Sequence, residues 1–462
     1  MNQKCAAFFE WIRGRKIAVI GIGVSNTPLI RLLAAKGARV TACDRKSLTE
    51  LGDLVEELMS LGVTLKLGEH YLDELDAELL FRTPGMRPDI APLCQARERG
   101  VTVTSEMEVF FALCPCKIIA VTGSDGKSTT TSLIAALLKA QGKRCHLGGN
   151  IGRPLLPDIE KIEQGDVAVL ELSSFQLMTM RRSPDVAVIT NVAPNHLDWH
   201  TSMEEYAGSK ENIFLHQDEN GLLVLNADND YTRSYAARAK GRVLLFSRRE
   251  KVDDGCYYAD GWIRRVRNGA DAPFLRRDEL HLPGDHNVEN FMAALCAVRG
   301  LVSDDTVRRV AADFAGLPHR LELVRELDGV RYYNDSIASS PTRTRACFAS
   351  FKQKIIVILG GYDKKIAFDD FGADVVRNAK AAVLIGVTAP KIEQAIRSAA
   401  GYRTDTPILR QATSLEEAVR EARALAAPGD VVVLSPACAS FDMFRNFMER
   451  GDRFRELVSA LN

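Results

Sequence analysis

The chain has 462 residues, of which 46% are apolar, and its 60 basic residues are balanced by 60 acidic ones. At roughly 150 residues per domain, this length predicts about three domains, each large enough to bury its own core. The zero net charge excludes a general electrostatic attraction to nucleic acid or to a membrane surface. The sequence lacks a signal-peptide core and any apolar run of roughly 18 residues. We therefore expect a soluble cytoplasmic protein with no membrane or nucleic-acid partner.

Ten cysteines are scattered along the chain. None forms a C-x-x-C motif, and no paired zinc spacing occurs. This pattern predicts reduced, mostly buried thiols rather than a disulfide framework.

Short apolar runs alternate with helical patterns, which predicts an α/β protein built from parallel sheets. In the first region, "KIAVIGIG" (16–23) predicts a strand and a glycine turn. The next segments predict a helix that Pro28 opens and Gly37 closes, and then a strand that ends at Asp44. We expect residues 1–112 to form a Rossmann-like domain.

A second region begins at "CKIIAVTG", and we expect residues 113–316 to form a P-loop-type parallel-sheet ATP-binding domain. Within it, residues 242–283 are rich in charge, glycine and aromatics, and we expect them to form a small antiparallel insert. "GLPHRLELV" marks a further boundary. Residues 317–462 return to alternating strands and helices, which predicts a Rossmann-like C-terminal domain.

The segment "VTGSDGKST" (121–129) predicts a phosphate-binding loop between a strand and a helix. Glycines allow backbone N–H groups to approach phosphate oxygens, Lys127 can reach the terminal phosphates and the Ser128 hydroxyl can hold Mg²⁺. The usual P-loop has a further glycine where this chain has Val121, so the spacing does not suit a GTPase or kinase.

Polar residues follow the next two apolar strands. Glu171 ends "DVAVLE", where a carboxylate can anchor a metal, and His196 lies in "NVAPNHLDWH". Ligands bind at the carboxyl ends of the strands in open α/β sheets, so both side chains are candidates for the same site.

Nine motifs occur in the order found in the Mur ligases, and the resemblance covers nearly the whole chain, from about residue 16 to 455. They are "TGSDGKST", "GGNIGRP", "ELSSFQL", "NVAPNHLDWH", "GDHNVEN", "GLPHRLE", "NDSIASSP", "LGGYDKK" and "SPACASFDMFRNF". The chain most resembles the branch of the family that adds D-glutamate to UDP-N-acetylmuramoyl-L-alanine. That family uses a shortened TG-x-x-GK-[ST] loop, which accounts for the spacing here.

The resemblance implies ATP-dependent formation of an amide bond through an acyl phosphate, with two Mg²⁺ ions and a carbamylated Lys210. It implies a catalytic group of Lys127, His196 and Lys210, and metal ligation by Ser128, Glu171, His196 and Lys210. It implies ATP binding by Gly123, Ser124, Asp125, Gly126, Lys127, Ser128, Thr129, Asn287, Asn290, Arg320 and Asp335. Because Ser124-Asp125 replaces the commoner Thr-Asn, we expect the Asp125 carboxylate to point away from the phosphates or to face a cation.

For the UDP-linked substrate, the resemblance implies contacts from Ser25, Asn26, Asp44, Arg45, Thr83, Pro84, Gly85, Asn150 and His196. For D-glutamate it implies contacts from Ser339, Lys364, Ser440 and Phe447. The chain departs from some relatives at Ile337 and Ser339, where "NDSKATN" is common, so one lysine of that motif is absent here. It implies a monomer with these small-molecule partners, acting in peptidoglycan synthesis.

Several alternatives stay open. The chain can be another Mur-type ligase with a different amino acid, although it lacks the "DNPR" string expected of diaminopimelate- or lysine-adding relatives. It can also be a non-catalytic binding paralogue, although Lys127, Glu171, His196 and Lys210 are all present. "GIGVSN" is a weak dinucleotide fingerprint with Asn26 in place of the third glycine, and the second nucleotide loop disfavours an NAD enzyme.

Overall fold

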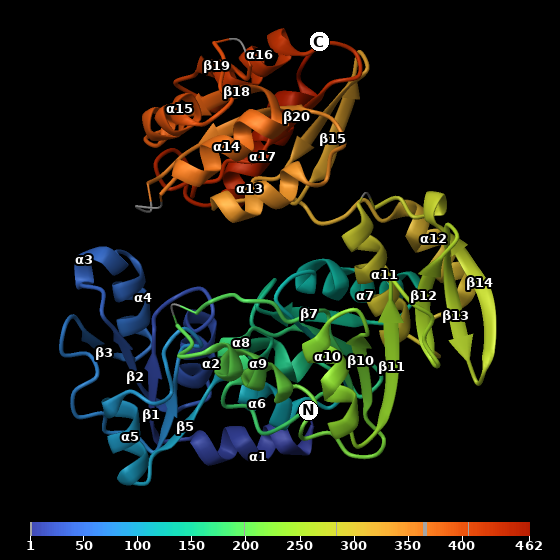
Figure 1. Ribbon diagram of the computed structural model, residues 1–462. Coiled ribbons are helices and arrows are strands. Elements are labelled where there is room, and N and C mark those ends of the chain that lie inside the picture. Colours follow the sequence, from blue (N-terminus) through green and yellow to red (C-terminus); the bar gives the residue numbers. More distant parts are fainter. Residues whose placement is uncertain (1, 198, 283, 364–366, 405) are drawn as a thin grey trace. The chain divides into compact units, whose positions relative to one another are not determined.

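The computed structural model describes residues 2–197, 199–282, 284–363, 367–404 and 406–462 (Figure 1). The chain divides into two compact units. Unit 1 comprises residues 1–281 and 285–314, and unit 2 comprises residues 282–284 and 315–462. Three sheets account for the described strands, two in unit 1 and one in unit 2.

The first sheet of unit 1 is entirely parallel, as a Rossmann-like domain requires. Its strands, in spatial order, are β3 (Thr64–Leu67), β2 (Arg39–Asp44), β1 (Lys16–Ile20), β4 (Leu79–Phe81) and β5 (Thr102–Thr104). The predicted helix is α2 (Thr27–Ala35), and Gly37 follows it with a φ of 83°. The sequence prediction for this region is confirmed.

The central sheet is mixed. Its strands, in spatial order, are β14 (Ala270–Arg276), β13 (Trp262–Arg267), β12 (Gly255–Ala259), β11 (Arg242–Ser247), β10 (Leu222–Asn226), β9 (Val186–Ile189), β6 (Lys117–Thr122), β8 (Val167–Glu171) and β7 (Cys145–Gly149). β6, β8 and β9 are almost wholly buried, which explains their continuous apolar sequences.

The expected antiparallel insert is smaller than residues 242–283 and is continuous with this sheet. β11 runs parallel to β10, because α10 (Asp230–Tyr235) crosses between them, and β12 runs parallel to β11. Antiparallel pairing begins at the β12–β13 hairpin, whose two-residue turn is Asp260-Gly261. The turn Asn268-Gly269 joins β13 to β14, and positive φ at all four turn residues matches the twist of such hairpins.

The other helical segments of unit 1 cover these sheets and connect their strands. They are α1 (Gln3–Ile12), α3 (Leu48–Leu51), α4 (Leu54–Ser60), α5 (Ala91–Glu98), α6 (Glu106–Leu113), α7 (Lys127–Ala140), η1 (Leu156–Lys161), α8 (Ser174–Leu177), α9 (Met203–Glu211), η2 (Ala236–Arg238), η3 (Arg277–Glu279), α11 (Asp285–Ala297) and α12 (Asp304–Asp313).

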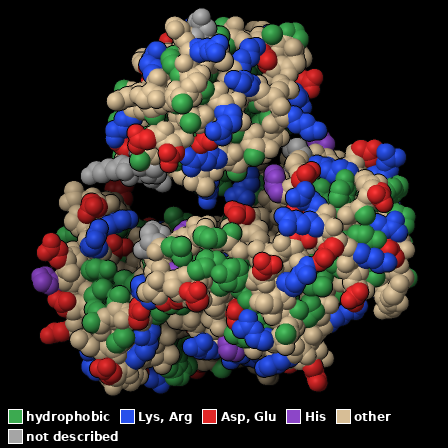
Figure 2. Space-filling view, viewed as in Figure 1, with side chains coloured by type: hydrophobic (Ala, Val, Ile, Leu, Met, Phe, Trp, Pro, Cys, Tyr) green, Lys and Arg blue, Asp and Glu red, His purple; other side chains and the backbone are tan. Residues whose placement is uncertain are grey.

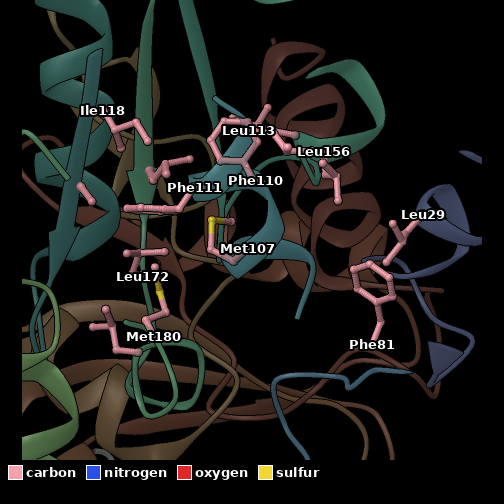
Figure 3. Packing of buried hydrophobic residues seen from close by; sticks show 14 of the residues in the cluster. Leu29, Phe81, Met107, Phe110, Phe111, Leu113, Ile118, Leu156, Leu172 and Met180 are labelled. Carbon is pink, nitrogen blue, oxygen red and sulfur yellow. The ribbon is translucent and has the colours of Figure 1, made fainter. Parts of the chain in front are cut away.

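One apolar core runs continuously from the first sheet to the central sheet, and α6 lies at its middle. Figure 3 shows side chains of α6 between those of the first sheet's layer and those of the central domain. The labelled residues are Leu29, Phe81, Met107, Phe110, Phe111, Leu113, Ile118, Leu156, Leu172 and Met180. The two predicted N-terminal domains therefore share buried surface, although their sheets lie within the predicted ranges.

Unit 2 has a six-stranded sheet that is parallel except at one edge. Its strands, in spatial order, are β15 (Glu322–Leu327), β16 (Val330–Asn334), β20 (Val431–Leu434), β17 (Ile355–Gly360), β18 (Ala379–Ile385) and β19 (Ile408–Gln411). Its helices are α13 (Pro341–Phe348), α14 (Asp369–Asn378), α15 (Ala389–Ser398), α16 (Leu415–Leu425) and α17 (Phe447–Ser459). Separate apolar clusters cover the two faces of the sheet, as in a doubly wound fold.

The balance of basic and acidic residues in the sequence is also visible at the surface. Figure 2 shows Lys, Arg, Asp and Glu side chains interspersed over the visible face of each unit. Among the helices that the structure describes, none has both the length and the apolar character needed to cross a bilayer. All ten cysteines are free thiols, and seven of them are buried.

Candidate active site

The predicted phosphate loop leaves the carboxyl end of β6, and two glycines determine its path. Gly123 has a φ of 149°, and a Cβ there would lie 1.9 Å from the Thr190 hydroxyl oxygen. Gly126 has a φ of 77°, and a Cβ there would lie 2.2 Å from Oδ1 of Asn290. Any larger side chain at either position would displace the loop, so this loop conformation requires glycine at both.

Two residues after β9 hold this loop in place, and the sequence analysis missed both. The Thr190 hydroxyl donates to the Asp125 carbonyl (2.5 Å), and the Asp125 N–H donates to Oδ1 of Asn191 (3.0 Å). The Ser124 N–H donates to the Asn191 carbonyl (2.9 Å). The adjacent polar pair at the end of an apolar strand was the available signal. The Asp125 side chain is exposed, in keeping with the expectation that it points away.

Two lysines converge on one carbonyl of the loop. Lys127 Nζ donates to the carbonyls of Gly123 (2.9 Å) and Ser124 (2.8 Å), and Lys210 Nζ donates to the carbonyl of Gly123 (3.0 Å). The Lys210 side chain is 1% exposed. Burial, and secondarily the charge of Lys127, lower the pKa of Lys210 well below its usual value, while Asp125 and Glu171 oppose the shift. These effects favour the neutral amine over the ammonium form.

The helix that carries Lys210 is fixed to the same loop. Ser202 caps α9 by accepting from the Glu205 N–H. One turn before Lys210, the Tyr206 hydroxyl lies 2.9 Å from the Ser124 hydroxyl, and the Lys210 ammonium nitrogen lies 4.5 Å from the centre of the Tyr206 ring. These contacts fix the direction in which the amine points.

Glu171, the last residue of β8, supplies a buried carboxylate beside this loop. It is 1% exposed, and its Oε1 accepts from Nδ2 of Asn150 (2.7 Å). Its Oε2 is buried with no hydrogen-bond partner among the described residues. A buried carboxylate oxygen without a donor is costly unless a cation compensates it. The donor set therefore fits a hard divalent cation such as Mg²⁺.

The other predicted metal ligands lie on the same sheet edge. Ser128 is half-buried in the first turn of α7. His196 is exposed, has a φ of 54°, and its ring centre lies 5.0 Å from that of Phe175. Left-handed backbone in a residue other than glycine often marks a functional position. The described residues hold no cluster of three or more His, Cys, Asp or Glu side chains with metal-binding geometry, so any site here needs other ligands as well.

The two asparagines expected near the adenine lie on one face of α11. Nδ2 of Asn290 donates to Oδ1 of Asn287 (3.0 Å), and the Thr130 hydroxyl donates to Oδ1 of Asn290 (3.4 Å). Thr129 is buried in the same turn of α7. The start of α11 thus packs against the helix that follows the phosphate loop.

The predicted UDP-binding turn follows β1. Asp44 Oδ2 accepts from the Ile22 N–H (2.6 Å) and its Oδ1 accepts from the Lys46 N–H (2.9 Å), so this carboxylate holds the glycine turn. The buried Asn26 amide donates to the Ile20 carbonyl (2.9 Å). Ser25 and Arg45 are exposed beside this turn.

A buried arginine shapes the neighbouring segment Thr83-Pro84-Gly85, and the sequence analysis missed it. Arg82 is 1% exposed and donates to three carbonyls of residues 83–86, including that of Met86 (3.0 Å). It also donates to the Thr179 hydroxyl (2.9 Å) after α8. It thereby joins the segment Thr83-Pro84-Gly85 to the helix that follows Glu171 and to the residues after it.

In unit 2, Asp335 follows β16 and is 4% exposed. Its carboxylate accepts from the Ser435 hydroxyl (2.8 Å) and the Leu321 N–H (3.3 Å). Burial raises the pKa of Asp335 to about 7, against the effect of these donors and of Arg320. Arg320 is half-buried two residues before β15.

Of the residues expected to contact D-glutamate, Ser339 and Ser440 lie on loops of unit 2 and Phe447 begins α17. Ser339 and Phe447 are half-buried, and Ser440 is 3% exposed. Lys364 lies outside the described residues.

Buried Arg450 on α17 organises two of these loops, and the sequence analysis did not identify it. It donates to the hydroxyl (3.0 Å) and carbonyl (2.8 Å) of Ser336 and to the carbonyls of Cys438 (3.1 Å) and Ala439 (3.2 Å). The loops that carry Ser339 and Ser440 are therefore joined through one guanidinium group.

Known proteins match both units. The Mur ligase middle domain model matches residues 121–298, and the Mur ligase, glutamate ligase domain model matches residues 319–438. The chain is 53% identical over 465 residues to the UDP-N-acetylmuramoylalanine--D-glutamate ligase of Acetivibrio thermocellus, with 100% of each chain covered. It is 49% identical over 462 residues, again with 100% of each covered, to the protein of the same name from Clostridium beijerinckii.

The chain belongs to the Mur ligase family. This confirms the resemblance that the motifs indicated.

Solved structures of Mur ligases share the fold. UDP-N-acetylmuramate-alanine ligase MurC from Thermotoga maritima matches with a TM-score of 0.57 and 20% identity, covering 96% of this chain and 99% of that one. MurF from Acinetobacter baumannii matches with a TM-score of 0.57 and 18% identity, covering 77% and 82%. At these identities the likeness shows the three-sheet α/β architecture alone.

Proposed function

We propose that this Mur ligase joins D-glutamate to UDP-N-acetylmuramoyl-L-alanine in an ATP-dependent step of peptidoglycan precursor synthesis. Its full-length relatives carry the name of that ligase, and the motifs favour the same branch. The observation that carries the proposal is that Lys127 and Lys210 both donate to the Gly123 carbonyl. This carbonyl lies at the carboxyl ends of the parallel strands, where Glu171 ends β8.

The reaction has two steps. A carboxylate is a poor acyl donor because its oxygen is a poor leaving group, so ATP first transfers its γ-phosphoryl group to the alanyl carboxylate and releases ADP. The amine of D-glutamate then attacks the acyl phosphate, and the amide forms as inorganic phosphate and a proton leave. Negative charge gathers in both steps, which is why a catalyst needs fixed cations and N–H donors.

The loop supplies those groups. Residues 123–129 would present backbone N–H groups to the phosphates, with the start of α7 adding a favourable field. Lys127 would leave its carbonyl partners to contact the terminal phosphates. Two Mg²⁺ ions, when bound, would neutralise phosphate charge and align the reacting oxygens. Ser128 and Glu171 would hold one ion, and His196 would help to hold the other.

Lys210 would act as a carbamate. Its neutral amine can add CO₂, which forms an N–C bond, releases one proton and converts the side chain into an acidic metal ligand. The burial that disfavours the ammonium form supports this reaction. The carbamate would also add the carboxylate-type ligand that the described site needs beside Glu171.

The remaining residues would recognise the substrates. We assign the UDP-linked substrate to Asn150 and to the two turns of the first sheet, and the adenine to Asn287 and Asn290. We assign the ATP phosphates and ribose to Arg320 and Asp335. We assign D-glutamate to Ser339, Lys364, Ser440 and Phe447. The protein would work as a monomer in the cytoplasm, where ATP and UDP-linked precursors are available.

The test is release of phosphate from ATP with Mg²⁺ and UDP-N-acetylmuramoyl-L-alanine. D-glutamate should support release, while L-glutamate, L-lysine and meso-diaminopimelate should not, and Lys127→Ala should abolish it. Release with a different amino acid would support the ligase chemistry and overturn the D-glutamate assignment. Ile337 and Ser339 would then be the first residues to test for the changed specificity. No release with any amino acid would favour a non-catalytic paralogue.

A further inference from the structure

Two cysteines that the proposed reaction does not use lie together where the chain passes from α6 to β6. Cys114 and Cys116 flank Pro115, and their sulfur atoms are 3.6 Å apart. The Cys114 thiol also lies within 3.8 Å of the Cys116 carbonyl. A disulfide needs about 2.05 Å between sulfurs, so closure would require the two sulfurs to approach by about 1.5 Å.

The two thiols have different surroundings. Cys114 is half-buried, and Cys116 is 8% exposed. Contact with Cys114 lowers the pKa of Cys116, against the effect of burial, and the same contact raises the pKa of Cys114. The sulfur contact allows either thiol to stabilise the thiolate of the other, and Cys114 is the more accessible of the two.

We propose that Cys114 and Cys116 form a redox-active dithiol site, which a hydroperoxide converts reversibly to a disulfide. The pair stands at the amino end of β6, whereas the phosphate loop leaves the carboxyl end of the same strand. It is therefore a separate site from the one that binds nucleotide.

The chemistry balances with the hydroperoxide as the oxidant. The Cys116 thiolate attacks the peroxide, the O–O bond breaks, and with one proton the products are a Cys116 sulfenic acid and water. The Cys114 sulfur then attacks the Cys116 sulfur, a second water leaves, and the S–S bond forms. Two thiols are oxidised and one peroxide is reduced to two waters.

The chain contains matched controls. Cys256 and Cys296 are also in contact, and contact with Cys256 contributes to the raised pKa of Cys296, but both residues are buried at 3% exposure or less. Cys94 and Cys145 are half-buried, like Cys114, and neither is hydrogen-bonded to a second thiol among the described residues, although Cys145 lies near enough to Cys116 to feel its charge. The buried pair Cys256 and Cys296 shows what thiol contact does without solvent access. Cys94 and Cys145 show what solvent access does without a hydrogen bond to a second thiol.

The first experiment uses the full-length protein and hydrogen peroxide. After brief exposure, free thiols are alkylated and the protein is digested with trypsin. The peptide of residues 100–117 contains Cys114 and Cys116 and none of the other cysteines. We expect it to lose two hydrogens and escape alkylation on the order of tenfold faster than the Cys94 and Cys145 peptides react. A thiol reductant should restore alkylation.

Two variants assign the roles. In Cys114→Ser, a sulfenic acid at Cys116 should accumulate and be trapped by dimedone, because the resolving thiol is absent. In Cys116→Ser, oxidation of Cys114 should slow on the order of tenfold. If the wild-type peptide stays alkylatable while Cys94 or Cys145 oxidises, or if the disulfide joins other cysteines, the proposal is wrong. That wild-type result stands even if a variant fails to fold.

Discussion

Each unit of the molecule buries a basic side chain, and the two burials lead to opposite chemistry. Lys210 in unit 1 is 1% exposed and donates to a single carbonyl, and its pKa falls well below the usual value. Arg450 in unit 2 is fully buried and donates to three carbonyls and a hydroxyl. Burial lowers the pKa of Arg450 to about 10, which leaves it charged at neutral pH.

The two buried cations also differ in the number of hydrogen-bond acceptors around them. A guanidinium group presents several donors in a fixed plane and retains its charge when they are all satisfied. An ammonium group with one acceptor is poorly compensated, so the neutral amine is favoured. Lys210 is therefore suited to react, and Arg450 is suited to hold loops in place.

The largest expected effect comes from Lys210→Met. Turnover should fall on the order of 10³-fold, because the carbamate is lost. The free energy of unfolding at neutral pH should change by about 1 kcal/mol or less, since a neutral amine is replaced by an apolar chain of similar length. Phosphate release and urea denaturation measure the two quantities. Lys139→Met, at an exposed position of α7, is the matched control and should change neither.

A readout independent of activity sharpens this first prediction. Isotopically labelled bicarbonate should give a protein-bound carbamate signal in carbon NMR, and Lys210→Met should lack it. A stability loss of several kcal/mol in the variant, or a carbamate signal that persists, would show that Lys210 is a structural cation like Arg450.

Arg450→Met should have the opposite profile. It leaves three buried carbonyls and the Ser336 hydroxyl without their donor, and we expect the free energy of unfolding to fall by about 3–5 kcal/mol. Denaturation of the full chain measures this loss. Arg453→Met on the same helix, where the arginine forms partly exposed ion pairs with Glu416 and Glu456, should cost about 1 kcal/mol or less. Equal losses in the two variants would contradict the structural role.

A pH series extends the comparison to a buried acid. The pKa of Asp335 is raised from 3.8 to about 7, so the native state binds the proton more tightly than the unfolded state. The protonated Asp335 carboxyl therefore stabilises the native state below about pH 4. This stabilisation is lost as the pH rises to 7, which lowers the free energy of unfolding by up to about 4 kcal/mol. Asp335→Asn should lack that slope. Urea denaturation of both proteins between pH 4 and pH 7 measures this slope. If the free energy of unfolding changes with pH equally in the two proteins, the prediction is wrong.

The smallest expected effect compares two buried tyrosines. The Tyr206 hydroxyl is hydrogen-bonded to Ser124, whereas the Tyr332 hydroxyl is buried and has no partner among the described residues. Tyr206→Phe should cost about 1 kcal/mol and weaken ATP binding, while Tyr332→Phe should be neutral or slightly stabilising. Thermal melting with and without ATP distinguishes them. A loss of stability in Tyr332→Phe would show that its hydroxyl is satisfied after all.

The sequence predicted the α/β class and the strand–loop–helix units because these depend on local patterns. The phosphate loop followed from the spacing of Gly123, Gly126 and Lys127, and the antiparallel hairpins are marked by two-residue turns such as Asp260-Gly261. The single-residue roles expected for the substrates came from family resemblance and stay predictions.

Residues that act at long range were missed. Thr190 and Asn191 reach the loop from another strand; the polar pair at the end of an apolar strand marked them as candidates, but no local pattern identifies their partner. Arg82 likewise contacts α8 and the segment after it from far along the chain. For Arg450 a signal did exist. Its position falls on the face of α17 that buries Gly451, Phe454 and Val458, so a charged residue there implied an internal partner.

The placement of α6 has a consequence for how the protein unfolds. Its apolar side chains belong to a core that both sheets of unit 1 share (Figure 3), so neither sheet can lose its packing without exposing surface of the other. The number of units that unfold cooperatively is set by the buried surface that the sheets share, not by the number of sheets. Heating the chain should therefore give at most two melting transitions, with the first and central sheets disordering together in one of them.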